Sequence, residues 1–397
     1  MPDTRIAINV HTPFIQDRTD RKLLSEELTS RISAYSHDVT AFGGYDQGNL
    51  SFNATIDDCN DWLINGLGRE IQTISPSGRI IWQGFVNNID ITYGSVNRTV
   101  GPLLDIGNKV KNKYVFVDPD TDIPLHGVET ETAYVEDTIS QGKYGIFEVT
   151  LNGGEQSHIE ALQTVNSYLY QHSWPEKSRR VNLSNPSVPS IKLSLLGYYH
   201  WFSYVFNDPS TGEGNLSDKI KAIIDADPNS VLEYTATSIA ANTTQVKSYE
   251  DGNKKADALL KALVMTSDNT YDRYSFGVYD DRVVYYNPIV APDPPAYVHN
   301  PNDISGKIYD TYDNEVYPWD VLPGKWLYMT GFDIGRWFPD GASPVFSRQN
   351  TSNDMIDYMF IEKVGFSIPN RVVLDGGKVI GFDQRLSFAK GLSGAIV

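Results

Sequence analysis

The stretch from Asp57 to Tyr114 decides the fold. It opens with Asp58-Cys59-Asn60-Asp61-Trp62-Leu63-Ile64-Asn65-Gly66-Leu67-Gly68 and later reads Arg79-Ile80-Ile81-Trp82-Gln83-Gly84-Phe85-Val86. The first run has apolar residues at helical spacing, Asp57 or Asp58 to cap its start and glycines to close it. The second run pairs with residues 69–75 across Pro76-Ser77-Gly78 as a hairpin. We therefore expect a short helix followed by an antiparallel hairpin whose alternation continues to Tyr93.

Composition and charge narrow the class of protein. The chain has 397 residues, 40% of them hydrophobic, which predicts two or three packed domains. Its single cysteine, Cys59, lies on the apolar helix face and indicates a core thiol. Apolar runs are too short for a membrane-spanning helix, and the N-terminal residues do not resemble a signal peptide.

The formal net charge of −17 is spread along the whole chain. Such a surface repels phosphate, so we expect no sequence-specific nucleic-acid binding. Two interpretations of the acidity stay open: ordinary solubility, or a non-adhesive wall past which a polyanion slides.

The predicted fold class is α+β and mainly antiparallel β. The expected domains are a barrel-like unit with one helix at 1–117, an inserted helix-containing segment and linker at 118–189, a second α+β unit at 190–328 and a β segment at 329–397. A helix followed by a hairpin occurs twice, around Asp57–Tyr93 and Asp251–Asn287. Closure of the first unit into a barrel would remove its exposed strand edges.

Aromatic residues are expected to form the structural core. They are Trp62, Trp82, Phe85, Tyr93, Tyr279, Trp319 and Trp326. Trp82 and Phe85 have opposite parity, so a regular strand points them to opposite faces. Both are buried only if the strand is covered on each side, or if a bulge at Gly84 shifts the alternation.

Motifs that carry chemistry are missing from the sequence. Gly391-Leu392-Ser393-Gly394-Ala395 is the nearest approach to a hydrolase elbow, but alanine replaces the closing glycine. Asp118, Asp120 and Asp122 alternate as in the opening of a calcium loop and Glu129 falls at its twelfth place, yet Ile123 stands where such a loop needs glycine. We therefore predict no catalytic residue, metal site or cofactor, and expect the chain not to be an enzyme.

Several segments together resemble tail structural proteins of tailed bacteriophages. They are the helix Asp58–Gly68, Trp82-Gln83-Gly84-Phe85-Val86-Asn87, Gly101-Pro102-Leu103-Leu104-Asp105-Ile106-Gly107-Asn108, Leu195-Leu196-Gly197-Tyr198-Tyr199, Phe276-Gly277-Val278-Tyr279-Asp280-Asp281-Arg282 and Tyr317-Pro318-Trp319-Asp320-Val321-Leu322-Pro323-Gly324. In length and domain order the chain is most similar to the baseplate or tail hub. The resemblance implies a homotrimer with two tube-like domains per chain, located in the virion after synthesis in the host cytoplasm.

The same resemblance implies a role and partners. Three chains would join a sixfold tail tube to a threefold tip and line the channel through which DNA is ejected. The partners would be the tail tube protein, distal tail or baseplate proteins, and a tip, spike or fibre protein. Two alternatives remain: a distal tail or adhesion protein that binds host-surface carbohydrate, and a cell-wall glycosidase.

Overall fold

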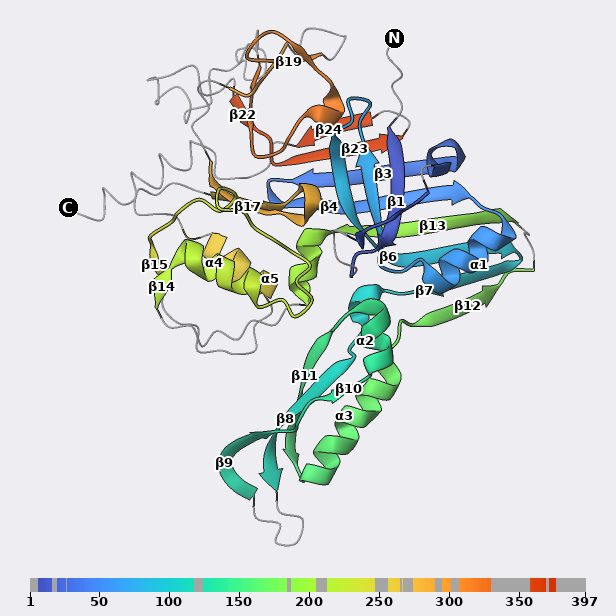
Figure 1. Ribbon diagram of the computed structural model, residues 1–397, viewed down its shortest axis with the longest axis vertical. Helices are drawn as coiled ribbons and strands as arrows, with labels where there is room; N and C mark the ends of the chain where they lie inside the picture. The colour runs from blue at the N-terminus through green and yellow to red at the C-terminus, as the bar shows by residue number, and fades with distance from the viewer. Residues whose placement is uncertain are drawn as a thin grey trace, which may run out of the picture.

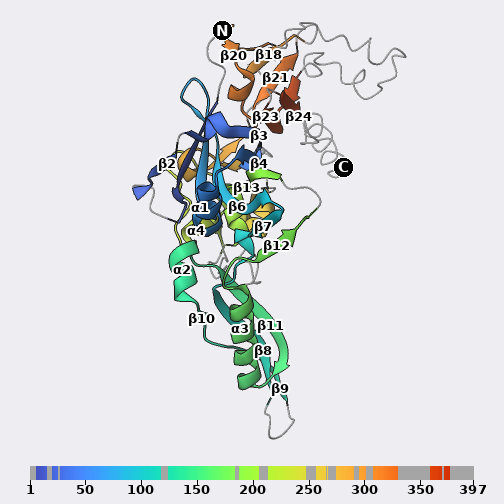
Figure 2. The same ribbon diagram turned by 90° about the vertical axis from the view of Figure 1, so that its right-hand side faces the viewer.

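The computed structural model describes residues 6–15, 20–25, 27–117, 124–183, 187–204, 213–246, 256–264, 266, 274–289, 295–300, 307–329, 358–368 and 371–375. It confirms a mixed α+β fold built mostly from antiparallel strands (Figure 1). A central sheet forms the body, an arm projects from one end of the body, and a smaller sheet lies at the other end (Figures 1 and 2). Within the described part of the chain, none of the helices combines the length and apolarity needed to cross a membrane.

The central sheet joins strands from widely separated parts of the chain, in the order β2-β1-β5-β6-β13-β4-β3-β23-β24. Strand β7 pairs with β6 and β12, and β16 pairs with β4 and β17. The strands are β1 (Ala7–Pro13), β2 (Leu23–Ser25), β3 (Ile32–Thr40), β4 (Phe42–Asn53), β5 (Arg69–Ile74), β6 (Ile80–Gly94), β7 (Val96–Val100), β12 (Lys177–Val181), β13 (Ser187–Gly197), β16 (Tyr274–Val278), β17 (Val284–Pro288), β23 (Lys363–Ile368) and β24 (Arg371–Asp375).

Strand β6 forms the centre of this sheet and is covered on both faces. Trp82 and Phe85 are fully buried although they point to opposite sides. Pairing with β5 is regular from Trp82 to Phe85, and the irregularity in that ladder comes before it, between Trp82 and Ile80. The bulge considered at Gly84 is therefore absent. Gly84 instead gives the Trp82 indole room, because a Cβ there would lie 2.6 Å from the ring.

Helix α1 (Ile56–Asn65) packs on the sheet through Trp62, whose ring centroid lies 5.7 Å from that of Phe52. Its start differs from the prediction. Thr55 is the capping residue, and Asp58 completes a capping box by accepting a hydrogen bond from the Thr55 backbone N–H. A threonine cap with an acidic residue three positions later satisfies two backbone donors at the start of the helix, so the capping residue precedes both Asp57 and Asp58.

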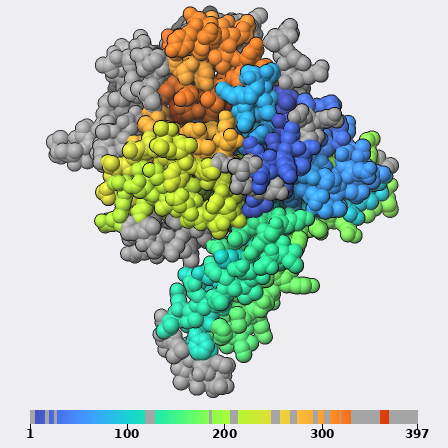
Figure 3. All heavy atoms as spheres, viewed as in Figure 1, coloured from blue at the N-terminus to red at the C-terminus, as the bar shows by residue number. Residues whose placement is uncertain are grey.

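The arm (residues 103–176) is an α/β insertion between β7 and β12. Val100 and Lys177 pair across these strands, so the chain leaves and re-enters the body at the same place. The arm contains a 3-10 turn η3 (Leu103–Asp105), β8 (Lys109–Val117), β9 (Pro124–Glu131), β10 (Val135–Glu136), α2 (Thr138–Tyr144), β11 (Glu148–Gln156) and α3 (His158–His172). Its sheet has the order β10-β8-β11, with β9 paired to β8. The space-filling view shows that the arm extends well beyond the body (Figure 3).

The remaining elements form a helical module and a terminal sheet. The module comprises η4 (Tyr198–Ser203), β14 (Gly214–Asn215), α4 (Leu216–Asp225), β15 (Gln245–Val246), α5 (Ala256–Val264) and η5 (Asp280–Arg282). The terminal sheet has the order β20-β19-β18-β21-β22. It comprises β18 (Tyr297–His299), β19 (Ile308–Asp310), β20 (Glu315–Val316), η6 (Pro318–Asp320), β21 (Trp326–Met329) and β22 (Tyr358–Phe360).

The structure divides the chain differently from the predicted boundaries. The boundary at 190 falls inside β13, which pairs with both β4 and β6 of the central sheet. The boundary at 118 separates β8 from the arm, although β8 pairs with β11. Of the predicted segment 329–397, the described part is 329, 358–368 and 371–375, where β23 extends the central sheet beside β3.

The predicted core residues occupy three environments. Trp62, Trp82 and Phe85 are buried, whereas Tyr279, Trp319 and Trp326 are partly buried and pack against core clusters. Tyr93 is 45% exposed, so its predicted place in the core is wrong. It lies at the end of β6, opposite Val96 and beyond the part of the sheet that α1 covers.

Candidate functional site

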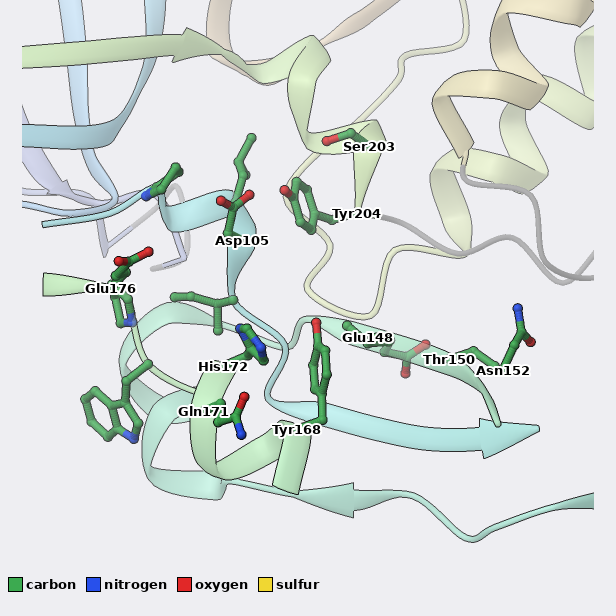
Figure 4. A pocket seen from close by; sticks show the side chains of 16 residues that line it. Asp105, Glu148, Thr150, Asn152, Tyr168, Gln171, His172, Glu176, Ser203 and Tyr204 are labelled. Carbon is green, nitrogen blue, oxygen red and sulfur yellow. The ribbon is translucent and has the colours of Figure 1, made fainter. Parts of the chain in front are cut away.

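A cleft of about 880 Å³ lies where the arm joins the body. Figure 4 shows its walls, which come from η3, β11, α3 and the end of η4. The labelled lining side chains are Asp105, Glu148, Thr150, Asn152, Tyr168, Gln171, His172, Glu176, Ser203 and Tyr204. We call this space the arm cleft.

Local backbone contacts set the width of the arm cleft. The Gly107 N–H donates to the His172 carbonyl at 2.9 Å and thereby ties the start of the arm to the end of α3. A Cβ at Gly107 would lie 2.7 Å from the Tyr168 ring. Glycine is thus required for the close approach of this backbone to Tyr168, which stands as one wall of the cleft.

The chemistry of the arm cleft is acidic and aromatic. Asp105, Glu148 and Glu176 contribute carboxylates, and Lys109 pairs with Glu148 at 2.7 Å from outside the lining. Burial, with the nearby Asp105 charge, raises the pKa of Tyr204, and the same two causes raise that of Tyr168. Both phenols therefore stay protonated at neutral pH and can donate hydrogen bonds. The cleft can stack and hydrogen-bond a neutral polar ligand, whereas its carboxylates repel anions.

Buried polar contacts order the base of the arm through Asn108 and hold it on the body through Asn229. Asn108 is fully buried; its amide nitrogen donates to the Gly145 carbonyl at 2.8 Å, and its amide oxygen accepts from Phe147 N–H at 2.8 Å. Asn229 of the body exchanges two hydrogen bonds with the backbone of Ile146, each 2.8 Å long. The arm therefore keeps a defined orientation, and the walls of the cleft are fixed by the same contacts.

A second polar site joins the two helix-and-hairpin units. Glu70 of β5 is fully buried and accepts from Arg282 at 3.1 and 2.8 Å, from Arg21 at 2.9 Å and from the Tyr198 hydroxyl at 2.5 Å. Burial alone would raise the pKa of Glu70, but the charges of Arg282 and Arg21 hold it below the ordinary carboxyl value. This carboxylate is ionised and fully hydrogen-bonded, which is the requirement for a buried charge.

Sequence reasoning missed both polar sites. Glu70 and Arg282 are 212 positions apart, and each reads locally as a solvent-facing residue of a strand or turn. The one signal in the sequence was the tight turn at Asp280-Asp281 between two strands; in the structure Asp281 and Arg282 have positive φ there. Among the described residues no group of His, Cys, Asp or Glu could hold a metal ion. Residues 118–123 of the predicted acidic loop lie outside the described residues.

Several solved structures match the chain loosely, and two of them are tail proteins. No protein-family model and no curated protein matches the chain. A 43 kDa tail protein of prophage MuSo2 from Shewanella oneidensis matches with 6% identity and a TM-score of 0.39, over 94% of this chain and 95% of that one. A tail protein from Neisseria meningitidis MC58 matches with 8% identity and a TM-score of 0.42, over 96% and 98% of the two chains. These values are low, so the function is inferred from the features of the chain itself.

Proposed function

We propose that the chain is a structural component of a bacteriophage tail. Its role would be a trimeric tail or baseplate hub in the virion, which joins the sixfold tail tube to the threefold tip and lines the DNA channel. The observation that carries the proposal is the shared sheet. Both helix-and-hairpin units belong to it, because β16 of the second unit pairs in parallel with β4, and β13 joins β4 to β6 of the first unit.

This shared sheet suits an adaptor between two symmetries. Each chain presents two helix-and-hairpin units, α1 with β5–β6 and α5 with β16–β17, in one rigid layer. The buried contact of Glu70 with Arg282 fixes the second unit against the first. Three such chains would present six units toward a sixfold ring while keeping threefold symmetry overall.

The two ends of the molecule offer separate attachment points. The arm extends from one end of the body, and the five-stranded terminal sheet lies at the opposite end (Figure 1). A chain that contacts a tube on one side and a tip, spike or fibre on the other needs this separation. The net charge of −17 fits a channel wall that repels DNA phosphates, so that DNA passes without adhering.

The test is to locate the chain in assembled particles. Tails from cells that express an epitope-tagged chain should bind the matching antibody only at the tip end, and cells lacking the chain should yield no complete tails. Antibody bound along the whole tube or on the capsid would contradict the proposal, and so would particles that bind no antibody.

The arm cleft favours a second candidate, an adhesion role in which the chain binds a neutral host-surface carbohydrate. Aromatic rings beside planar polar side chains form a site that can stack against a sugar and hydrogen-bond its hydroxyls. Calorimetric titration with neutral oligosaccharides tests this role. Tyr168→Ala should abolish binding, whereas Tyr170→Ala on the same helix, 91% exposed and outside the lining, should not. Heat changes that are equal in both variants would exclude the cleft as a sugar site.

A further inference from the structure

The β7–β12 pair, which we call the cationic ribbon, stands out in an acidic protein. Its ten residues include Arg98, Lys177, Arg179 and Arg180 and no acidic residue. All five residues of β12 are exposed, and among the described strands only β7 pairs with it. In the described part of the chain, no carboxylate forms an ion pair with any of these four side chains.

One face of the ribbon combines positive charge with apolar surface. The cross-strand register places Arg179 opposite Arg98, and Arg98 opposite Ile91 of β6, so these side chains share a face. In the next row, Val181 lies opposite Val96, and Val96 lies opposite Tyr93. Val181 is 60% and Tyr93 is 45% exposed. Arg180 has the opposite parity and points to the other face.

Repulsion between Arg98 and Arg179 lowers the stability of the sheet in an isolated chain. Like charges directly opposite one another on neighbouring strands repel and destabilise a sheet. Helix α1 covers the same sheet face further in, where Gly66 approaches Ile89, but the outer rows carry exposed Tyr93 and Val181. A carboxylate from a docked molecule would relieve the repulsion between the two arginines. The residues around that carboxylate would cover Tyr93 and Val181.

The opposite flank of the molecule supplies such carboxylates. Figure 1 shows the ribbon at one side of the body and α4 at the other. Glu213, Asp218 and Asp225 are exposed there, and we call them the acidic flank. Asp218 accepts a hydrogen bond from Asn215 at 3.0 Å and forms a long ion pair with Lys221 at 3.9 Å, and Asp225 accepts from the Tyr234 hydroxyl at 3.1 Å. The two surfaces are complementary in charge and lie on different sides, which is the arrangement of a head-to-tail contact.

We propose that the cationic ribbon of one copy binds the acidic flank of a second copy. The inference rests on the proposed trimeric function and names the interface that would close the ring. Arg179 and Lys177 would face Asp218 and Asp225 of the neighbouring copy, with Tyr93 and Val181 covered at the same contact. Because the groups are exposed in the free chain, the contact weakens as salt screens it.

Sedimentation equilibrium of the full chain tests this contact with a matched pair of variants. Arg179→Glu and Arg180→Glu make the same charge change at neighbouring positions on opposite faces. We expect Arg179→Glu to weaken self-association by about tenfold or more and Arg180→Glu by less than about threefold. Asp218→Lys should weaken association as Arg179→Glu does, and the combined variant Arg179→Glu with Asp218→Lys should restore it. Wild-type association should also fall at about 1 M salt, where the Debye length is about 3 Å.

Thermal unfolding of the same variants separates docking from folding. Arg179→Glu should not lower the melting temperature, because it replaces a repulsive pair with Arg98 by an attractive one. Equal effects of the two arginine variants, failure of the combined variant to restore association, or a wild-type monomer at all concentrations would each overturn the inference. Duplex DNA binding that is lost in Arg179→Glu would assign the ribbon to nucleic acid instead. If the chain forms a trimer and the ribbon variants leave that trimer intact, the proposed interface is wrong but the proposed function is not. If the chain is absent from phage tails, the proposed function itself is wrong.

Discussion

Trp82 shows how one large side chain organises the packing on its face of the central sheet. Its indole is fully buried, stacks over His37 at 6.4 Å and lies 6.5 Å from the Tyr45 ring. Gly48 and Gly84 flank the ring, and a Cβ at either would lie within 3.3 Å of it. The glycines and the tryptophan therefore form one packing unit, in which small residues accommodate the largest side chain.

We predict that Trp82→Ala lowers the free energy of unfolding by about 3–5 kcal/mol, because it leaves a cavity that the rigid sheet cannot fill. Urea titration of the variant and the wild type measures the change. Tyr312→Ala, at a side chain that is 84% exposed, is the control and should change stability by less than about 0.5 kcal/mol. A loss below about 1 kcal/mol for Trp82→Ala would contradict the described core.

His37 gives the fold a pH dependence. It lies between Trp82 and Phe366, whose ring centroid is 5.2 Å away, and its Nδ1 is 2.8 Å from the Tyr35 hydroxyl. Burial lowers the pKa of His37 from 6.5 to about 3. Below pH 6.5 His37 is therefore protonated in the unfolded chain, whereas in the folded chain it stays neutral until about pH 3. The stability associated with neutral His37 is complete above pH 6.5 and is lost as pH falls through this window.

We predict that His37→Phe flattens the pH dependence of stability. Wild-type stability should fall by up to about 1.4 kcal/mol per pH unit below pH 6 through this group, and the variant should lack that contribution. Urea titrations at several pH values between 7 and 5 measure the two slopes. Parallel curves for the two proteins would show that His37 is protonated in the folded state.

Among the elements, the contact of β5 with η5 is held by charge in a dry site. Glu70 and Arg282 are both almost fully buried, and Arg282 also donates to the Phe14 carbonyl at 2.7 Å. Removing one partner leaves the other charge uncompensated in the interior. We predict that Glu70→Gln costs about 3–5 kcal/mol of unfolding free energy in a denaturant titration.

The exposed pair of Lys307 with Glu315 provides the comparison for this buried pair. Its atoms are 2.9 Å apart, and the two side chains are 43% and 46% exposed. Glu315→Gln should therefore cost less than about 1 kcal/mol. If Glu70→Gln were no more destabilising than Glu315→Gln, the carboxylate could not be the link between the two units.

The arm depends in the same way on Asn108. We predict that Asn108→Ala costs on the order of 3 kcal/mol, because the Gly145 carbonyl and the Phe147 N–H lose their partner inside the protein. Hydrogen exchange followed by mass spectrometry should show faster exchange around residues 145–147 and little change in β6. Asn166→Ala, on the exposed face of α3, is the control. Unchanged exchange at 145–147 would mean that Asn108 does not order the base of the arm.

At the scale of the whole molecule, local patterns in the sequence predicted more than long-range pairings did. The helix around Trp62, the β5–β6 hairpin and the α+β class follow from apolar spacing and turn residues. The pairing of β23 with β3 and of β16 with β4 joins segments separated by hundreds of residues, and no periodicity encodes such partners. Tyr93 was misplaced because strand alternation continues beyond the part of the sheet that is covered.

The functional surfaces were hidden from sequence reasoning for the same reason. The arm cleft forms only where η3, α3 and η4 meet, and the Glu70 site combines residues from the two halves of the chain. The cationic ribbon depends on β12 returning beside β7 after the whole arm has been inserted. Its composition was visible in Lys177-Ser178-Arg179-Arg180, but its register with Arg98 was not.

Cryo-electron microscopy of the intact phage tail tests the central claim most directly. The account predicts three copies of this chain in a closed ring at the tip end of the tail, each contributing two helix-and-hairpin units next to the sixfold tube. It also predicts that Asp and Glu outnumber Lys and Arg on the wall of the channel, as the net charge of −17 suggests. A sixfold ring of this chain, its absence from the tail, or a channel lined mainly by Lys and Arg would contradict the account.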